Sequence, residues 1–119
     1  MNDLKRRTFD YAVKVAKLII SLLPSAINKA YCNQLIRSSS SIGANYRAAQ
    51  RAKSTADFIN KLKIVEEEAD ETVYFLELLL EFNKAEAETI IGLINEGTEI
   101  LRIIVASLKT ARNNLNSSA

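Results

Sequence analysis

The stretch TADFINKLKIVEEEADETVYFLELLL, residues 55–80, contains the clearest structural signal of this chain. Its apolar or small side chains recur at alternating steps of four and three, a spacing that places them along one face of an α-helix. That line consists of Phe58, Leu62, Val65, Ala69, Thr72, Leu76 and Leu79. Ser54, followed three residues later by Asp57, has the spacing of a capping box at a helix start. The sequence therefore predicts a long amphipathic helix over residues 55–82.

The preceding stretch, LIRSSSSIGANYRAAQRA at residues 35–52, forms a second helical line that is rich in small residues. The line contains Leu35, Ser38, Ile42, Asn45, Ala49 and Ala52. Gly43 inside a helix costs about 1 kcal/mol relative to Ala, and close approach of a neighbouring backbone is the usual compensation. Tight helix packing is therefore the favoured interpretation, with a ligand role for residues 38–41 as the alternative. We expect Asn45 to be a buried polar group that sets the register between helices.

Two further helices complete the prediction of an all-α, up-down-up-down antiparallel four-helix bundle that forms a single domain, residues 1–119. The helices are expected at about 4–23, 29–52, 55–82 and 84–112, with a frayed tail at 113–119. Pro24 ends the first helix, and Asn83 with Glu86 has the spacing of a cap for the last one. The expected core face of the first helix comprises Phe9, Ala12, Val13, Ala16, Ile19, Ile20 and Leu23. That of the last comprises Ile90, Ile91, Ile94, Thr98, Leu101, Ile104, Val105, Leu108 and Ala111.

Apolar residues also lie beside the core lines of the last two helices. They are Ile64, Phe75, Leu78, Phe82, Leu93, Ile100 and Ile103. A helix in a monomeric bundle needs one apolar stripe, so wider stripes favour a surface that contacts another copy of the chain. The alternative is that these residues only broaden a thick core. We expect homo-oligomerisation, with these seven residues at the interface.

The residue types needed for chemistry are scarce. The chain has no histidine and one cysteine, Cys32, and its three glycines are isolated from one another. Paired Glu-x-x-His metal sites, histidine-activated nucleophiles and Gly-rich phosphate loops are therefore absent from the sequence. The acidic run at residues 66–71 is interpreted as a solvated helix face. We expect no enzyme activity, no catalytic residue, no metal, no cofactor and no small-molecule substrate.

Charge is distributed unevenly along the chain. Residues 1–63 contain 12 Lys or Arg and 3 Asp or Glu, whereas residues 64–119 contain 4 and 11, and the whole chain has a net charge of +2. Such asymmetry favours either an anionic partner or complementary charges between subunits. The candidate nucleic-acid contacts are Arg37, Arg47, Arg51, Lys53 and Lys61. A basic helix stripe of this kind can follow phosphates, and the neighbouring Tyr46 can stack on a base. The alternative is a structural role, in which Arg37 pairs with Glu68 or Glu71.

Neither a signal peptide nor a membrane span is expected. Basic residues at 5–7 precede an apolar region, but charged residues interrupt that region, and only residues 18–23 are nearly uncharged. Such a segment is too short for either role. A single cysteine also fits a reducing compartment, so the sequence predicts a cytoplasmic protein.

Several motifs of the second and third helices are familiar together. They are LIRS at 35–38, SIGANYR at 41–47, RA at 51–52, ADFI at 56–59 and EADETVYFL at 68–76. In these motifs the chain resembles the bacterial four-helix-bundle proteins encoded in 23S rRNA intervening sequences. Distant relatives of that family include accessory proteins of diversity-generating retroelements, which form pentameric barrels and engage nucleic acid. The resemblance thus implies a ring-like homopentamer that binds RNA or DNA. The alternative is a protein–protein adaptor or structural oligomer that binds no nucleic acid.

Overall fold

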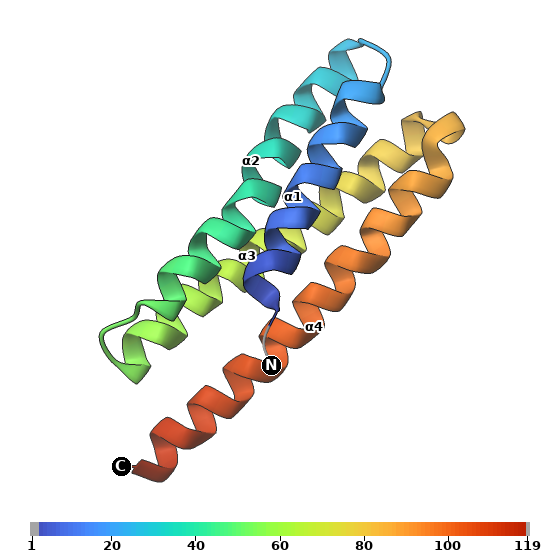
Figure 1. The fold of residues 1–119 in the computed structure, drawn as a ribbon. Coiled ribbons are helices and arrows are strands. Elements are labelled where there is room, and N and C mark those ends of the chain that lie inside the picture. The colour runs from blue at the N-terminus through green and yellow to red at the C-terminus, as the bar shows by residue number, and fades with distance from the viewer. Residues whose placement is uncertain (1–2, 119) are drawn as a thin grey trace.

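The computed structural model describes residues 3–118, and the side chains of residues 3–117, as an antiparallel bundle of four helices (Figure 1). The helices are α1 (Leu4–Ser21), α2 (Ala26–Gln50), α3 (Thr55–Phe82) and α4 (Ala87–Ser118), and the short 3₁₀ turn η1 (Lys84–Glu86) precedes α4. Each helix packs against its neighbour in the chain, and α4 returns to contact α1, which confirms the predicted fold. The bundle measures 53 × 23 × 20 Å because α4 extends well beyond the start of α1 (Figure 1).

The starts of α2 and α3 are fixed by side-chain caps. The Ser54 hydroxyl accepts the Asp57 N–H at 3.1 Å, and the Asp57 carboxylate accepts the Lys53 N–H at 3.2 Å, so the predicted cap of α3 is confirmed. Ser25 caps α2 in the same way, which places the start of that helix three residues earlier than predicted. The prediction that Asn83 caps the last helix is wrong, since its side chain makes no cap hydrogen bond. The last helix also continues past residue 112 as far as Ser118, where the sequence predicts a frayed tail; residue 119 lies outside the described residues.

The core line of α3 is the one that the sequence predicts. All of its members from Leu62 to Leu79 are buried, and Phe58 at its start is half-buried. On α2, the small residues bring two neighbours close. A Cβ atom at Gly43 would lie 3.1 Å from Thr8 Oγ1 of α1, and the Thr72 hydroxyl of α3 lies 2.9 Å from Ser38 Oγ. Tight packing therefore explains the small residues of α2.

Asn45 does not have the role that the sequence suggests. It is half-buried, and its Nδ2 donates to the carbonyl of Ser41 one turn earlier in the same helix, at 2.8 Å. The buried polar contact between α2 and α3 is instead the hydroxyl pair of Ser38 and Thr72, both of which are fully buried.

The core faces of α1 and α4 differ from the prediction. The buried line of α1 comprises Leu4, Thr8, Tyr11, Val15, Leu18 and Leu22, and the predicted core residues Phe9, Val13, Ile20 and Leu23 are exposed. On α4, Leu93 and Ile100 belong to the core, whereas Ile91 and Val105 are exposed. The physical reason is one contact: the Tyr11 hydroxyl donates to the Leu93 carbonyl at 2.9 Å, above Gly97. A side chain at position 97 would overlap the tyrosine, whereas glycine leaves room for it. The face of α4 that contains Leu93, Gly97 and Ile100 therefore packs toward the core.

Candidate nucleic-acid interface

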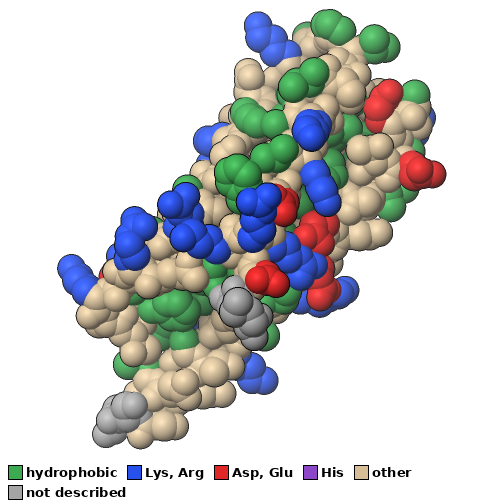
Figure 2. All heavy atoms as spheres, in the orientation of Figure 1, with side chains coloured by type: hydrophobic (Ala, Val, Ile, Leu, Met, Phe, Trp, Pro, Cys, Tyr) green, Lys and Arg blue, Asp and Glu red, His purple; other side chains and the backbone are tan. Residues whose placement is uncertain are grey.

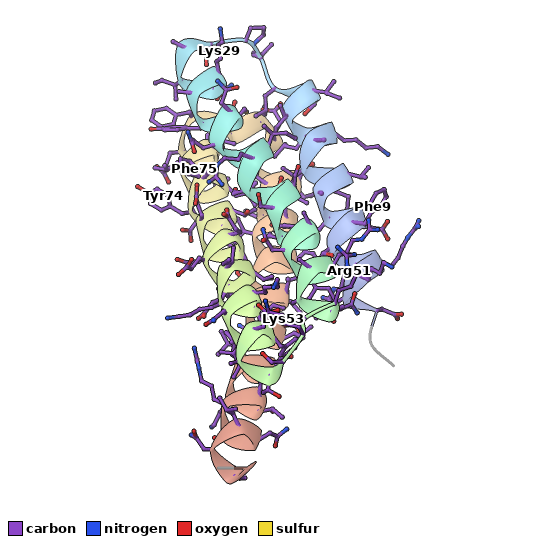
Figure 3. The ribbon with its side chains drawn as sticks, turned by 90° about the vertical axis from the view of Figure 1, so that its left-hand side faces the viewer. Phe9, Lys29, Arg51, Lys53, Tyr74 and Phe75 are labelled. Carbon is purple, nitrogen blue, oxygen red and sulfur yellow. The ribbon has the colours of Figure 1, made fainter. Side chains whose placement is uncertain are left out.

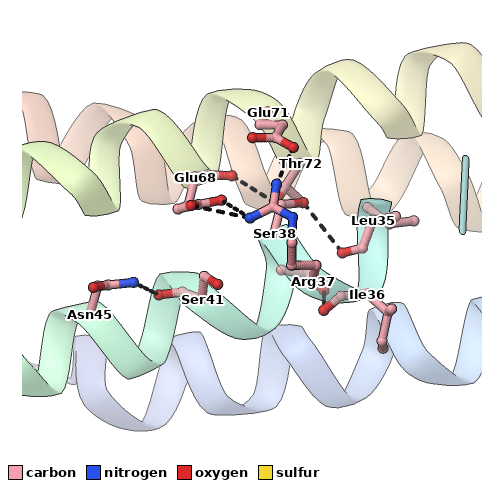
Figure 4. Close-up of polar contacts among 10 residues, drawn as sticks. Leu35, Ile36, Arg37, Ser38, Ser41, Asn45, Glu68, Glu71 and Thr72 are labelled. Atoms are coloured by element: carbon pink, nitrogen blue, oxygen red, sulfur yellow. Dashed lines mark hydrogen bonds and ion pairs between the residues drawn. The ribbon is translucent and has the colours of Figure 1, made fainter. Parts of the chain in front are cut away.

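The five predicted nucleic-acid residues fall into two groups. Arg37 and Lys61 are engaged by carboxylates of α3. Arg37 Nη1 donates to Glu68 Oε1 at 3.1 Å, and its Nη2 donates to Glu71 (Figure 4). The hydrogen bond to Glu71, with the charge of Glu68, raises the pKa of Arg37. Arg37 therefore joins α2 to α3, as the structural alternative in the sequence analysis expects, and its donors are directed toward α3.

Lys61 makes a contact within its own helix. Its Nζ lies 2.6 and 2.7 Å from the two carboxylate oxygens of Asp57, one turn earlier on α3. This contact is the main reason why the pKa of Asp57 is lowered, and the Lys53 N–H contributes as well. Lys61 is half-buried, so its ammonium group supports the start of α3.

Arg47, Arg51 and Lys53 form the second group, whose side chains are exposed. Figure 3 shows Arg51 and Lys53 at the end of the bundle where α2 ends, whereas Lys29 lies at the opposite end. Within residues 3–117, none of these three side chains makes an ion pair that would neutralise its charge. They remain available to an external anion.

A groove between α1 and α2 adds further basic residues to this group. Its volume is about 660 Å³, and it is lined by Asp3, Lys5, Arg6, Thr8, Phe9, Ala12, Ser40, Gly43, Ala44 and Arg47. The Arg6 guanidinium lies over the Phe9 ring, 5.7 Å from its centroid. Figure 2 shows the Lys and Arg side chains gathered on this part of the surface, over the start of α1 and the end of α2. We call Lys5, Arg6, Arg47, Arg51 and Lys53 the basic end.

The aromatic side chain of this region is Phe9, which the sequence analysis assigns to the core. Tyr46, the residue expected to stack on a base, is only 5% exposed and packs in the core, so that expectation is wrong. One signal for Phe9 is present in the sequence. It directly follows a basic run at residues 5–7, a neighbourhood more typical of a surface than of a core.

The predicted interface residues are also divided. Leu93 and Ile100 are 6% and 0% exposed, so they belong to the core of a single copy and present no surface to another. Phe82 and Ile64 are exposed, and Phe75, Leu78 and Ile103 are half-buried. Phe75 and Phe82 lie on either side of Tyr31 of α2, with ring centroids 6.1 and 6.2 Å away, and Tyr74 meets Phe75 edge-on at 5.4 Å. Together these rings form an aromatic cluster across α2 and α3.

The described residues contain no group of three or more His, Cys, Asp or Glu side chains that could hold a metal ion. Among them, no helix combines the length and the apolar character needed to cross a membrane. Burial raises the pKa of the Cys32 thiol, which favours its unreactive protonated form.

Comparisons with known proteins agree with the fold. A comparison with curated proteins finds no match. A crystal structure of a protein of unknown function from the S23 ribosomal protein family of Bacteroides thetaiotaomicron matches with a TM-score of 0.77 and 38% sequence identity, over 88% of this chain and 97% of that one. The model of the 23S rRNA-intervening sequence protein family matches residues 2–106. The chain belongs to the 23S rRNA-intervening sequence protein family.

Proposed function

We propose that this protein is a non-enzymatic helical bundle that assembles with copies of itself, as a homopentamer, and binds the phosphates of RNA or DNA through its basic end. The observation that carries the proposal is the separation of charge between helices. α1 and α2 together contain eight Lys or Arg and one acidic residue, whereas α3 contains two Lys and eight acidic residues. Such a surface attracts a polyanion without reading its sequence.

The basic end has the composition of a phosphate-binding surface. Arg47 lies in the last turn of α2 and Arg51 is the residue that caps its C-terminal end, so both lie at the same end of the helix. Lys5 and Arg6 approach from α1 across the groove, and Phe9 supplies an exposed aromatic ring. Phosphate contacts of this kind give affinity that falls steeply with salt, while a ring beside them favours unpaired bases. A function that acts on nucleic acid is also consistent with the cytoplasmic location that the sequence predicts.

Self-assembly is supported by apolar surface that one copy leaves uncovered. Exposed large apolar side chains include Val13, Ile20 and Leu23 in and just after α1, and Tyr74 and Phe82 on α3. Contiguous apolar surface in a small monomer marks an interaction site more often than it marks solvent-facing packing. The number of copies, five, is the expectation that follows from the family resemblance.

An RNA titration tests the nucleic-acid part of the proposal. A fluorescently labelled single-stranded RNA is titrated with protein at about 50 and 200 mM salt, the range over which phosphate contacts weaken strongly. We expect binding that weakens with salt and is lost in the double variant Arg47→Glu and Arg51→Glu. The matched control is Lys29→Glu with Lys84→Glu, which changes the net charge equally at the opposite end of the bundle (Figure 3).

The second candidate function is a protein–protein adaptor or structural oligomer that binds no nucleic acid. The engagement of Arg37 by α3 favours it, because part of the basic stripe is already neutralised within one copy. Absence of RNA binding at the lower salt concentration would support this function and would contradict the first.

A further inference from the structure

The first helix carries two apolar lines, and only one of them is used within a single copy. The inner line packs in the core. The outer line contains Phe9, Val13, Ala16 and Ile20, whose alternating steps of four and three are those of a coiled-coil seam, and Leu23 follows in the connection to α2. Ile20 and Leu23 are 83% and 78% exposed, respectively. We call Val13, Ala16, Ile20 and Leu23 the outer seam, and its three large side chains are exposed. Phe9, at the other end of the line, belongs to the groove of the basic end.

The charges of α1 beside the outer seam are mostly basic, and the one acidic residue of α1, Asp10, is paired with Arg6. Lys14 and Lys17 are exposed and flank it on the side of α4. On the other side α2 contributes exposed Ile36, and α2 contains no acidic residue at all. Figure 2 shows hydrophobic side chains on the upper part of this face and the basic end below them. The outer seam and the basic end are thus different parts of the α1–α2 surface.

A second uncovered apolar surface has the opposite charge beside it. In the aromatic cluster of α2 and α3, Tyr74 and Phe82 are 56% and 54% exposed. Glu77 and Glu81 are also exposed on α3, one and two turns beyond Tyr74. Figure 3 shows Tyr74 and Phe75 at the edge of the bundle formed by α3, on the side opposite to Phe9 of α1. One copy therefore presents both surfaces, on different sides of the bundle.

We propose that the outer seam of one copy docks on the aromatic cluster of the next, with Lys14 and Lys17 beside Glu77 and Glu81 of that next copy. The occupant of each surface is then a second copy of this chain, because apolar character matches and charge is opposite. Two unlike patches on different faces make a head-to-tail contact, which closes into a ring when the rotation between copies permits. This inference rests on the proposed self-assembly and specifies its surfaces.

The arrangement also determines where the basic ends lie. In a ring built by rotation, all copies have equivalent orientations relative to the ring axis. The docked surfaces cover the upper part of the α1–α2 face and leave the basic end outside the contact. Every copy then contributes its Lys5, Arg47, Arg51 and Lys53 at the same level of the ring. A nucleic acid can contact several basic ends at once, which increases affinity without any new type of contact.

Exchange of charges between the two surfaces tests the pairing. The measurement is sedimentation velocity at micromolar concentration, with circular dichroism to verify the helical fold of each variant. We expect Lys14→Glu with Lys17→Glu, and separately Glu77→Lys with Glu81→Lys, to weaken assembly at least about tenfold, because like charges then face each other. All four substitutions in one chain restore the opposite charges and are expected to restore assembly. The pairing would be overturned if the fourfold variant failed to recover assembly. It would also be overturned if the two double variants assembled like the wild type.

An apolar variant keeps the test independent of charge. Ile20→Asn with Leu23→Asn alters exposed residues, so the fold is retained while assembly is lost. Val105→Asn changes an exposed apolar residue of α4 outside both surfaces and is expected to leave assembly intact. A wild-type chain that stays at 13.3 kDa refutes self-assembly itself. If that monomer then floats with anionic lipid vesicles, the outer seam is assigned to a membrane surface instead. An assembled wild type whose Ile20 and Leu23 variant also assembles refutes only the pairing.

Discussion

Arg37 of α2 donates from Nη1 to both carboxylate oxygens of Glu68 on α3, at 3.1 and 3.3 Å. Arg47, ten residues later on the same helix, faces the groove beside α1 instead. The two arginines are indistinguishable by residue type, and the register between α2 and α3 decides which of them is neutralised.

This difference predicts unequal effects on RNA binding. Replacement of Arg47 by Gln should lower the slope of log affinity against log salt by about one, the change expected for one lost phosphate contact. Arg37→Gln should leave that slope unchanged, because its charge is already balanced by α3. Anisotropy titrations at several salt concentrations measure both slopes. An equal decrease in slope for the two variants would show that Arg37 leaves Glu68 and Glu71 when nucleic acid binds.

The two glycines of α4, buried Gly97 and exposed Gly92, give stability predictions of opposite sign. A Cβ atom at Gly97 would overlap the buried Tyr11 hydroxyl and lie 3.0 Å from Val73 Cγ2. Gly97→Ala should therefore destabilise the fold by about 2 kcal/mol, since overpacking exceeds the gain in helix propensity. A Cβ atom at Gly92 meets nothing within 4 Å, so Gly92→Ala should stabilise the fold by about 0.5–1 kcal/mol. Urea denaturation at one protein concentration compares them, and a stable Gly97→Ala variant would contradict the packing described for Tyr11.

The ion pair between α1 and α4 should make stability depend on pH. Arg7 donates to the two carboxylate oxygens of Glu96 at 2.7 and 2.8 Å, and this hydrogen bonding lowers the pKa of Glu96 although partial burial opposes the change. A carboxylate whose pKa is lower in the folded state stabilises the fold above its unfolded pKa, and the contribution is lost as pH falls through the folded value. Because the pair is about one-third exposed, Glu96→Gln should cost about 1 kcal/mol at pH 7 and almost nothing near pH 2.

Denaturation curves at the two pH values measure this difference. Glu67→Gln, at an exposed position of α3 with no ion pair to another described side chain, is the control and should have no effect at either pH. A penalty for Glu96→Gln that is equal at pH 7 and pH 2 would assign its effect to packing rather than to the ion pair.

Two side-chain amides form hydrogen bonds with each other at the end of the bundle that contains Lys29. Asn28 and Asn83 are both buried, and the Nδ2 of each donates to the Oδ1 of the other at 2.9 Å. Removal of one partner leaves the other amide buried without it, so Asn28→Ala and Asn83→Ala should each cost about 2 kcal/mol. The double variant should cost clearly less than the sum, with a coupling of about 1 kcal/mol. Strictly additive losses in a double-mutant cycle would show that the two amides do not depend on each other.

The sequence predicts what local periodicity determines. The core line of α3 has a single strong apolar pattern, and its cap at Ser54 depends on residues three apart, so both could be predicted. The core face of α1 could not be predicted in this way, because α1 contains two apolar lines with the same spacing. These are the outer seam and the line through Tyr11 and Val15. Spacing cannot rank two such lines, and the choice depends on Gly97, more than 80 residues away, which makes room for Tyr11.

The candidate site shows the same limit. Charge alone predicts that Arg47, Arg51 and Lys53 are exposed basic residues, and the structure confirms their exposure. Charge also predicts Arg37 and Lys61, whose carboxylate partners lie on α3. Lys61 was within reach of sequence reasoning, since Asp57 precedes it by four residues on one helix. The ion pair of Arg37 with Glu68 depends on the register between α2 and α3, which local sequence does not determine. The sequence therefore gives this pair only as an alternative.

Sedimentation equilibrium of the wild-type chain at micromolar concentration shows whether apolar surface left open by one copy is covered by other copies. We expect a single assembled species with five times the 13.3 kDa mass of one chain. A sample that remains at 13.3 kDa throughout the concentration range would contradict it.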